Sequence, residues 1–120
     1  MSDGAAAVLL TRRSVAKRMG LPIVGKWIGA AVVGVPPRIM GVGPLYAIPK
    51  VLDKAGISKE EVDFYEINEA FASQAVYSVQ QLGIPFEKVN LFGGAIAIGH
   101  PLGCSTCISK QLVSFSIHCN

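Results

Sequence analysis

Charged side chains are scarce in this chain, and their scarcity excludes several classes of protein. Of the 120 residues, 16% are charged and 51% are hydrophobic, whereas soluble domains usually carry about 25% charged residues. The net charge is only +3, and the basic residues form no continuous stripe that would bind nucleic acid. We therefore expect no nucleic-acid partner, and we expect much of the apolar surface to need a protein partner.

Long hydrophobic runs and a secretory signal are also missing. The most apolar stretch, residues 27–35, is much shorter than the roughly 20 apolar residues that a transmembrane helix needs. A secretory signal does not fit, because Asp3 precedes the first apolar residues and Arg12 and Arg13 follow them, the reverse of the usual order. We therefore expect no membrane span.

Cysteine is rare, with Cys104, Cys107 and Cys119 the only three in the sequence. The first two have the C-x-x-C spacing of redox and zinc sites, but no second pair of ligands precedes them. We interpret all three as free thiols of a reducing compartment and expect no metal site.

The remaining sequence alternates segments typical of strands with segments typical of helices. Apolar and β-branched runs predict strands over residues 5–10, 23–33, 62–67 and 89–92. Helices are predicted over residues 12–19, 48–55 and 71–82, and a glycine follows each of them. Thr11 is predicted to cap the first helix, and Pro49 is predicted to lie in the first turn of the second. This order predicts a layered α/β architecture.

Two polar residues stand where open α/β sheets collect active sites. Asn68 follows the predicted strand 62–67, and His100 lies in the glycine-rich loop of residues 93–103. An asparagine amide can hold a water or an oxyanion, and a neutral imidazole can take a proton from a thiol. Two plainer interpretations stay open: Asn68 as a helix N-cap, and His100 as a turn histidine bonded to its own loop.

Glu66 and Glu69 flank Asn68 and suggest a carboxylate pair for acid–base chemistry. Their place at the start of a predicted helix favours a supporting role instead. Residues 40–44, Met-Gly-Val-Gly-Pro, lack the lysine of a P-loop and the G-x-G-x-x-G spacing, so nucleotide binding by those modes is not expected. A glycine loop that opens a helix suits an extended ligand such as a pantetheine arm.

Four blocks, in order, resemble the C-terminal half of thiolases, most closely the peroxisomal 3-ketoacyl-CoA thiolases (acetyl-CoA C-acyltransferases). They are Ser-Asp-Gly-Ala-Ala-Ala at residues 2–7, the block at 40–44, Asn-Glu-Ala-Phe-Ala at 68–72 and the glycine-rich loop at 93–103. The resemblance implies a thiolase-like α-β-α-β-α layered sandwich. Within it, residues 1–105 would be a partial C-terminal domain and residues 106–120 a divergent tail.

The resemblance also implies an activity in lipid metabolism. Thiolases of fatty acid β-oxidation are acyltransferases that convert a 3-ketoacyl-CoA and coenzyme A to acetyl-CoA and a shortened acyl-CoA. His100 would match the histidine that activates a cysteine thiol, and Asn68 the residue that holds the oxyanion-hole water. Met40 and Phe71 would line the pantetheine channel. Coenzyme A is then a substrate, and no cofactor or metal is implied.

The implied partners are acyl-CoA and coenzyme A, together with a second copy of the chain or a full-length thiolase. The implied location is the peroxisome, although the ending Ser-Ile-His-Cys-Asn is not a peroxisomal address of the Ser-Lys-Leu type.

No cysteine of the chain matches either catalytic cysteine of the family, so we expect the isolated chain to be inactive. Two rival hypotheses are a non-catalytic interaction or regulatory fragment that associates with full-length thiolase, and an unstable product without function.

Overall fold

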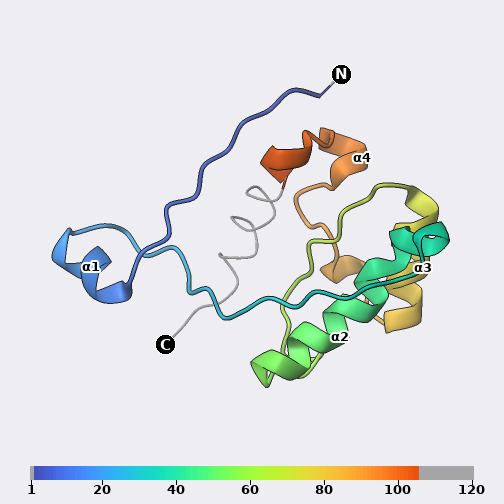
Figure 1. Ribbon diagram of the computed structural model, residues 1–120, viewed down its shortest axis with the longest axis horizontal. Helices are drawn as coiled ribbons and strands as arrows, with labels where there is room; N and C mark the ends of the chain where they lie inside the picture. The colour runs from blue at the N-terminus through green and yellow to red at the C-terminus, as the bar shows by residue number, and fades with distance from the viewer. Residues whose placement is uncertain (1, 106–120) are drawn as a thin grey trace. The chain divides into compact units, whose positions relative to one another are not determined.

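Helices joined by extended segments make up the described part of the protein. The structure, a computed structural model, describes residues 2–105. Its elements are α1 (Arg13–Arg18), the 3-10 helix η1 (Pro37–Val42), α2 (Gly43–Ala55), α3 (Ala72–Leu82), the 3-10 helix η2 (Phe86–Lys88) and α4 (Ala95–Ile98), as Figure 1 shows. None of the helices in residues 2–105 is long and apolar enough to cross a membrane.

The chain divides into two compact units. Among the described residues, one unit consists of residues 2–27 and 100–105, and the other of residues 28–99. The first contains α1, and the second contains the remaining helices from η1 to α4. His100 therefore belongs to the first unit and Asn68 to the second.

The three predicted helices are present as α1, α2 and α3. Gly56 and Gly83 end the latter two in the left-handed conformation, with φ of 67° and 60°, which glycine adopts without a steric cost. The predicted cap at Thr11 is wrong, because Arg12 is the N-cap of α1 and makes no side-chain capping bond. Helix α1 begins there without the hydroxyl bond that the sequence suggested.

Helix α2 begins earlier than predicted. Its first residue is Gly43, and Pro44 occupies the first turn, where a missing backbone N–H costs nothing. Pro49 therefore lies inside the helix, not in its first turn. The side of the helix that carries Pro49 is exposed, so water can bond the carbonyl that this proline leaves unpaired.

The prediction that these segments pair as strands of a sheet is wrong for the described residues. Within residues 2–105 the only strand-like pairing is one isolated parallel bridge between Tyr65 and Val89. It is made by Tyr65 N–H donating to Lys88 O over 2.7 Å and by Asn90 N–H donating to Tyr65 O over 2.8 Å. A parallel strand obtains its backbone bonds from neighbouring strands, which an apolar run does not specify.

A small hydrophobic core holds the second unit together. Its buried members are Tyr65, Ile67, Val79 and Ile84, and the partly buried Ile48, Val62, Leu82 and Val89 pack against them. The most buried face of helix α3 lies in this core. The buried hydroxyl of Ser78 on that face donates a hydrogen bond to Gln74 O over 2.8 Å. The segment 65–67 thus runs through the core and delivers Asn68 to its edge.

Candidate functional site

Asn68 lies just outside the core with an exposed side chain. Buried Ile67 precedes it, and α3 does not begin until Ala72, with Phe71 as its N-cap. The interpretation of Asn68 as the helix N-cap is therefore wrong. Among residues 2–105, no hydrogen bond occupies the Asn68 side-chain amide. Its amide is left available to a ligand or a water.

Gln74 connects two of the predicted motif segments, a role that the sequence did not reveal. Its Nε2 donates to Asn68 O over 3.0 Å. Its side chain also packs on Gly41, where an added Cβ would lie 3.2 Å from Gln74 Cβ. The segment that bears Met40 is therefore held beside the segment that bears Asn68.

Met40 and Phe71 are both strongly exposed apolar side chains. Their exposed fractions are 73% and 72%. Met40 lies on η1 and Phe71 at the start of α3, and these two elements contact each other. Exposed apolar groups at such a junction are suited to contact an extended ligand, which leaves their predicted role in a pantetheine channel open.

Glu69 fixes the start of the glycine-rich loop. One carboxylate oxygen, Oε1, accepts from Asn90 Nδ2 over 2.9 Å, and the other, Oε2, accepts from the backbone N–H of Ile96 over 3.0 Å. The carboxylate also fills the space where a Cβ on Gly94 would stand. Both oxygens are therefore used to hold structure, as expected of a supporting residue.

Asn90 is a second residue that sequence reasoning missed. Its side chain accepts from Ile67 N–H over 2.8 Å and donates to Ile67 O over 2.9 Å. It adopts a φ of 51°, which asparagine tolerates better than most residues. A lone asparagine within the predicted strand 89–92 was the only available signal.

Glu66 differs from Glu69 in its surroundings. Burial raises the pKa of the Glu66 carboxyl, and the neighbouring charge of Glu69 raises it further. Its Oε1 is buried without a hydrogen-bond partner among the described residues. The charge of Glu69 thus acts on Glu66, while both oxygens of Glu69 are already bonded to Asn90 and to the loop.

His100 is half-buried, and one of its ring nitrogens is bonded within its own segment. Nδ1 lies 2.8 Å from Ser105 Oγ, and that hydroxyl also donates to Pro101 O over 3.3 Å. Within the described residues, Nε2 makes no hydrogen bond. The contact matches the turn-histidine interpretation and leaves a second nitrogen for chemistry.

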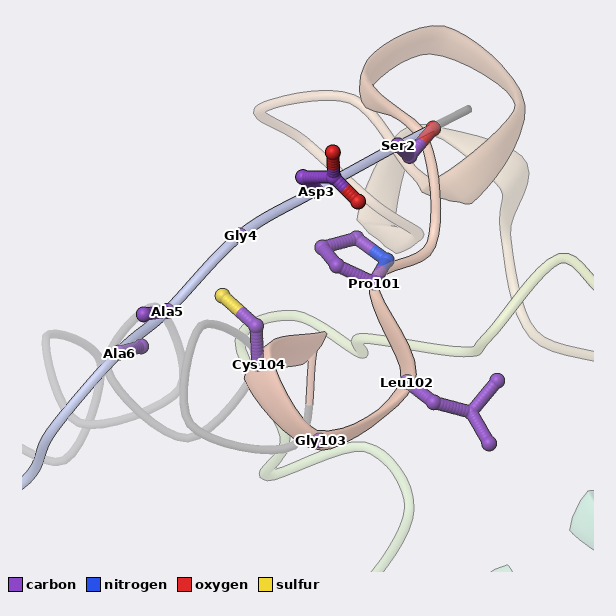
Figure 2. A pocket seen from close by; sticks show the side chains of 9 residues that line it. All are labelled: Ser2, Asp3, Gly4, Ala5, Ala6, Pro101, Leu102, Gly103 and Cys104. Atoms are coloured by element: carbon purple, nitrogen blue, oxygen red, sulfur yellow. The ribbon is translucent and has the colours of Figure 1, made fainter.

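Two motif blocks far apart in the sequence meet in the first unit. Residues 2–6 and 101–104 line an open hollow of about 360 Å³ (Figure 2). Gly4 is needed there, because an added Cβ would lie 2.8 Å from Pro101 Cγ and 3.2 Å from Cys104 Sγ. The segment that carries His100 is therefore braced by the N-terminal block.

Cys104 is a buried free thiol that packs against this block. Cys107 and Cys119 lie outside the described residues. Among residues 2–105, no three His, Cys, Asp or Glu side chains are grouped as metal ligands would be.

Comparison with known families decides the assignment of this chain. The family described as "Thiolase, C-terminal domain" matches residues 21–117. The chain belongs to the thiolase family. The match continues past Ser105, and the domain boundary expected at that residue stays a prediction.

Curated thiolases are similar to the chain over nearly its whole length. Mouse peroxisomal 3-ketoacyl-CoA thiolase B is 67% identical over 114 residues, which are 95% of this chain and 26% of that protein. The human peroxisomal 3-ketoacyl-CoA thiolase is 64% identical over 105 residues, 88% of this chain and 25% of that protein. The chain spans about a quarter of the length of these relatives.

Solved thiolase structures confirm the predicted fold class. A dimeric peroxisomal thiolase of Saccharomyces cerevisiae superposes with a TM-score of 0.82 at 54% identity, covering 87% of this chain and 27% of that one. Another structure of the yeast peroxisomal 3-ketoacyl-CoA thiolase, described as five-layered α-β-α-β-α, gives a TM-score of 0.79 at 52% identity, covering 91% and 31%. Human mitochondrial 3-ketoacyl-CoA thiolase gives 0.79 at 41% identity, covering 85% and 26%.

Proposed function

We propose that this chain is the part of a peroxisomal 3-ketoacyl-CoA thiolase that supplies the histidine and the asparagine of the active site. The reaction cleaves a 3-ketoacyl-CoA, transfers the shortened acyl group to coenzyme A and releases acetyl-CoA, as in fatty acid β-oxidation. The main support is the 67% identity to peroxisomal thiolases over 95% of the chain. Their printed location, the peroxisome, is part of the proposal.

The proposed roles follow from the chemistry of each side chain. His100 takes the proton of an attacking thiol through Nε2, since Nδ1 is bonded to Ser105. Asn68 holds a water that donates to the developing oxyanion, because its amide is exposed and unbonded among the described residues. Met40 and Phe71 contact the pantetheine arm with their exposed apolar surfaces.

A chimera tests these roles. Residues 2–105 would replace the matching segment of the yeast peroxisomal thiolase, and acetyl-CoA release from a 3-ketoacyl-CoA would be followed. The chimera should be active, and His100→Ala should lower kcat by about 10²–10⁴-fold, the usual contribution of a general acid–base. Lys54→Arg on the exposed side of α2 is a matched control with unchanged kcat. A folded chimera whose activity survives His100→Ala would contradict the proposal.

The isolated chain of 120 residues should show no thiolysis. The resemblance implies that none of Cys104, Cys107 and Cys119 is the nucleophile of the family, and a base without its thiol activates nothing. The purified chain would be assayed beside intact yeast thiolase at equal concentration. Acetyl-CoA release at a rate near that of the intact enzyme would refute this prediction and direct attention to Cys104, Cys107 and Cys119.

Large exposed hydrophobic side chains favour a second candidate function, a non-catalytic fragment that associates with a full-length thiolase. Leu9 and Leu10 in one unit are exposed by 78% and 69%, and Val32 in the other by 84%. Exposed apolar side chains that form a contiguous patch mark interfaces, and the adjacent Leu9 and Leu10 are candidates for such a patch. Co-purification of the tagged chain with intact yeast thiolase would support association, and a monomer that remains alone in the same experiment would argue against it.

A further inference from the structure

Among the described residues, the hydroxyl of Ser105 has two hydrogen-bonding neighbours, but it carries only one hydrogen. It lies 2.8 Å from Nδ1 of His100 and 3.3 Å from the carbonyl oxygen of Pro101. A carbonyl oxygen can only accept, whereas Nδ1 donates in one tautomer of the neutral imidazole and accepts in the other. Because the carbonyl oxygen can only accept, it determines which direction of the Ser105 hydroxyl hydrogen satisfies both contacts.

Both contacts are hydrogen bonds only when the Ser105 hydroxyl donates to Pro101 O and accepts from Nδ1–H. In the opposite arrangement the hydroxyl donates to Nδ1, and its lone pairs face the lone pairs of the carbonyl oxygen. Residues 102–105 are helical, and a helical serine commonly donates to the carbonyl four residues earlier, which is Pro101 here. The hydroxyl is thus directed toward the carbonyl by its own backbone.

We propose that Ser105 is a positioning residue that keeps the proton of neutral His100 on Nδ1 and the lone pair on Nε2. The ring then presents its basic nitrogen away from the Pro101–Ser105 turn. When a thiol reacts, its S–H bond breaks, the proton forms a bond to Nε2, and a thiolate faces an imidazolium that still donates through Nδ1. This consequence rests on the proposed function, whereas the tautomer does not.

Nitrogen NMR of the 120-residue chain tests the tautomer directly. The ¹⁵N-labelled chain would carry His118→Gln, so that His100 is the only histidine and its two ring nitrogens are assigned without overlap. Two-bond ¹H–¹⁵N correlations, recorded with the ring neutral, distinguish a protonated ring nitrogen from a bare one. We expect a protonated Nδ1 and a bare Nε2. A bare Nδ1 in this parent chain overturns the proposal by itself.

Two substitutions separate positioning from folding. Ser105→Ala should shift both nitrogen signals toward those of an unconstrained histidine side chain, which prefers the proton on Nε2, while Ser105→Thr keeps a hydroxyl and should retain the parent signals. Ser14→Ala in α1 is the matched control and should change neither nitrogen. Unchanged nitrogen shifts in a folded Ser105→Ala chain would overturn the proposal. The experiment involves no thiolysis, so an inactive chimera would refute the proposed function and leave the tautomer intact.

Discussion

The Glu69 carboxylate and the Asn90 amide form one continuous hydrogen-bond chain between backbone segments. Asn90 bonds both backbone groups of Ile67 and donates to Glu69 Oε1 over 2.9 Å, while Glu69 Oε2 accepts from Ile96 N–H over 3.0 Å. Side chains thereby extend the pairing that the backbone makes at the Tyr65–Val89 bridge. Asn68 lies between two members of this chain, Ile67 and Glu69, and is held from both sides.

Replacing Gly94 by alanine should disrupt this arrangement. The new Cβ would overlap the Glu69 carboxylate, although the Gly94 backbone itself, at φ −100°, suits any residue. Displacing the carboxylate removes the bonds from Ile96 N–H and from Asn90 Nδ2, although Asn90 Nδ2 keeps its bond to Ile67 O and Ile96 N–H is open to water. We expect a cost of about 0.5–1.5 kcal/mol for each bond lost. Amide hydrogen exchange at Ile96 would report the loss as faster exchange.

A double-mutant cycle identifies the cause. Glu69→Ala alone should also speed exchange at Ile96, and adding Gly94→Ala to it should cost little more, because the clashing group is gone. Gly43→Ala is the control, since a Cβ there meets nothing within 4 Å. Additive effects of Gly94→Ala and Glu69→Ala would show that the two positions do not interact.

The sequence predicted the helices better than the contacts between segments. The stripe of residues 71–82 and the terminal Gly83 specify α3, because helix bonds are local and follow the residue pattern. The predicted strands depended on partners distant in the sequence, and only Tyr65 and Val89 are bridged among the described residues. Periodicity does not encode which segments pair.

The sequence allowed Asn68 and His100 to be predicted as site residues, but it did not reveal the residues that support them. Asn68 and His100 were identified because a strand end and a glycine-rich loop are typical places for chemistry. Gln74 is one polar residue among several on a helix surface, and Ser105 is one of several serines. Their roles depend on bonds to Asn68 O and His100 Nδ1, which only the folded backbone brings within reach.

Substitutions at Asn90 should separate its backbone role from its side-chain role. Asn90→Gly relieves the positive φ of 51° but removes every side-chain bond, whereas Asn90→Asp keeps the shape and turns the donor into an acceptor. The aspartate then opposes both Ile67 O and the Glu69 carboxylate. We expect Asn90→Asp to be the more destabilising, by about 1–3 kcal/mol relative to the parent chain.

Urea unfolding of the parent chain and both variants at neutral pH would measure this difference. Asn90→Gly should lie between the other two, since it loses bonds without creating an opposed charge. A stability of Asn90→Asp equal to that of the parent chain would mean that the Asn90 donor makes no net contribution.

The raised pKa of Glu66 should give the second unit a pH dependence of definite sign. Burial and the charge of Glu69 make the folded state hold the Glu66 proton more tightly than the unfolded state does. The folded state then binds more protons, so the free energy of unfolding falls as the pH rises from the ordinary glutamate value of 4.5 through the raised value. The ionised carboxylate, with Oε1 buried and unbonded among the described residues, is the destabilised form.

Glu66→Gln removes this titration and should flatten that part of the stability curve. Urea unfolding at a series of pH values from acid to neutral would show the parent chain losing stability relative to Glu66→Gln as the pH rises. Glu61→Gln serves as a comparison of opposite sign. The carboxylate of Glu61 accepts a hydrogen bond from Ser58 N–H, which lowers the pKa of Glu61 and stabilises the folded chain increasingly as the pH rises. Glu61→Gln removes this stabilising contribution. Parallel curves for the parent chain and Glu66→Gln would show that the Glu66 carboxyl titrates as it does in the unfolded chain.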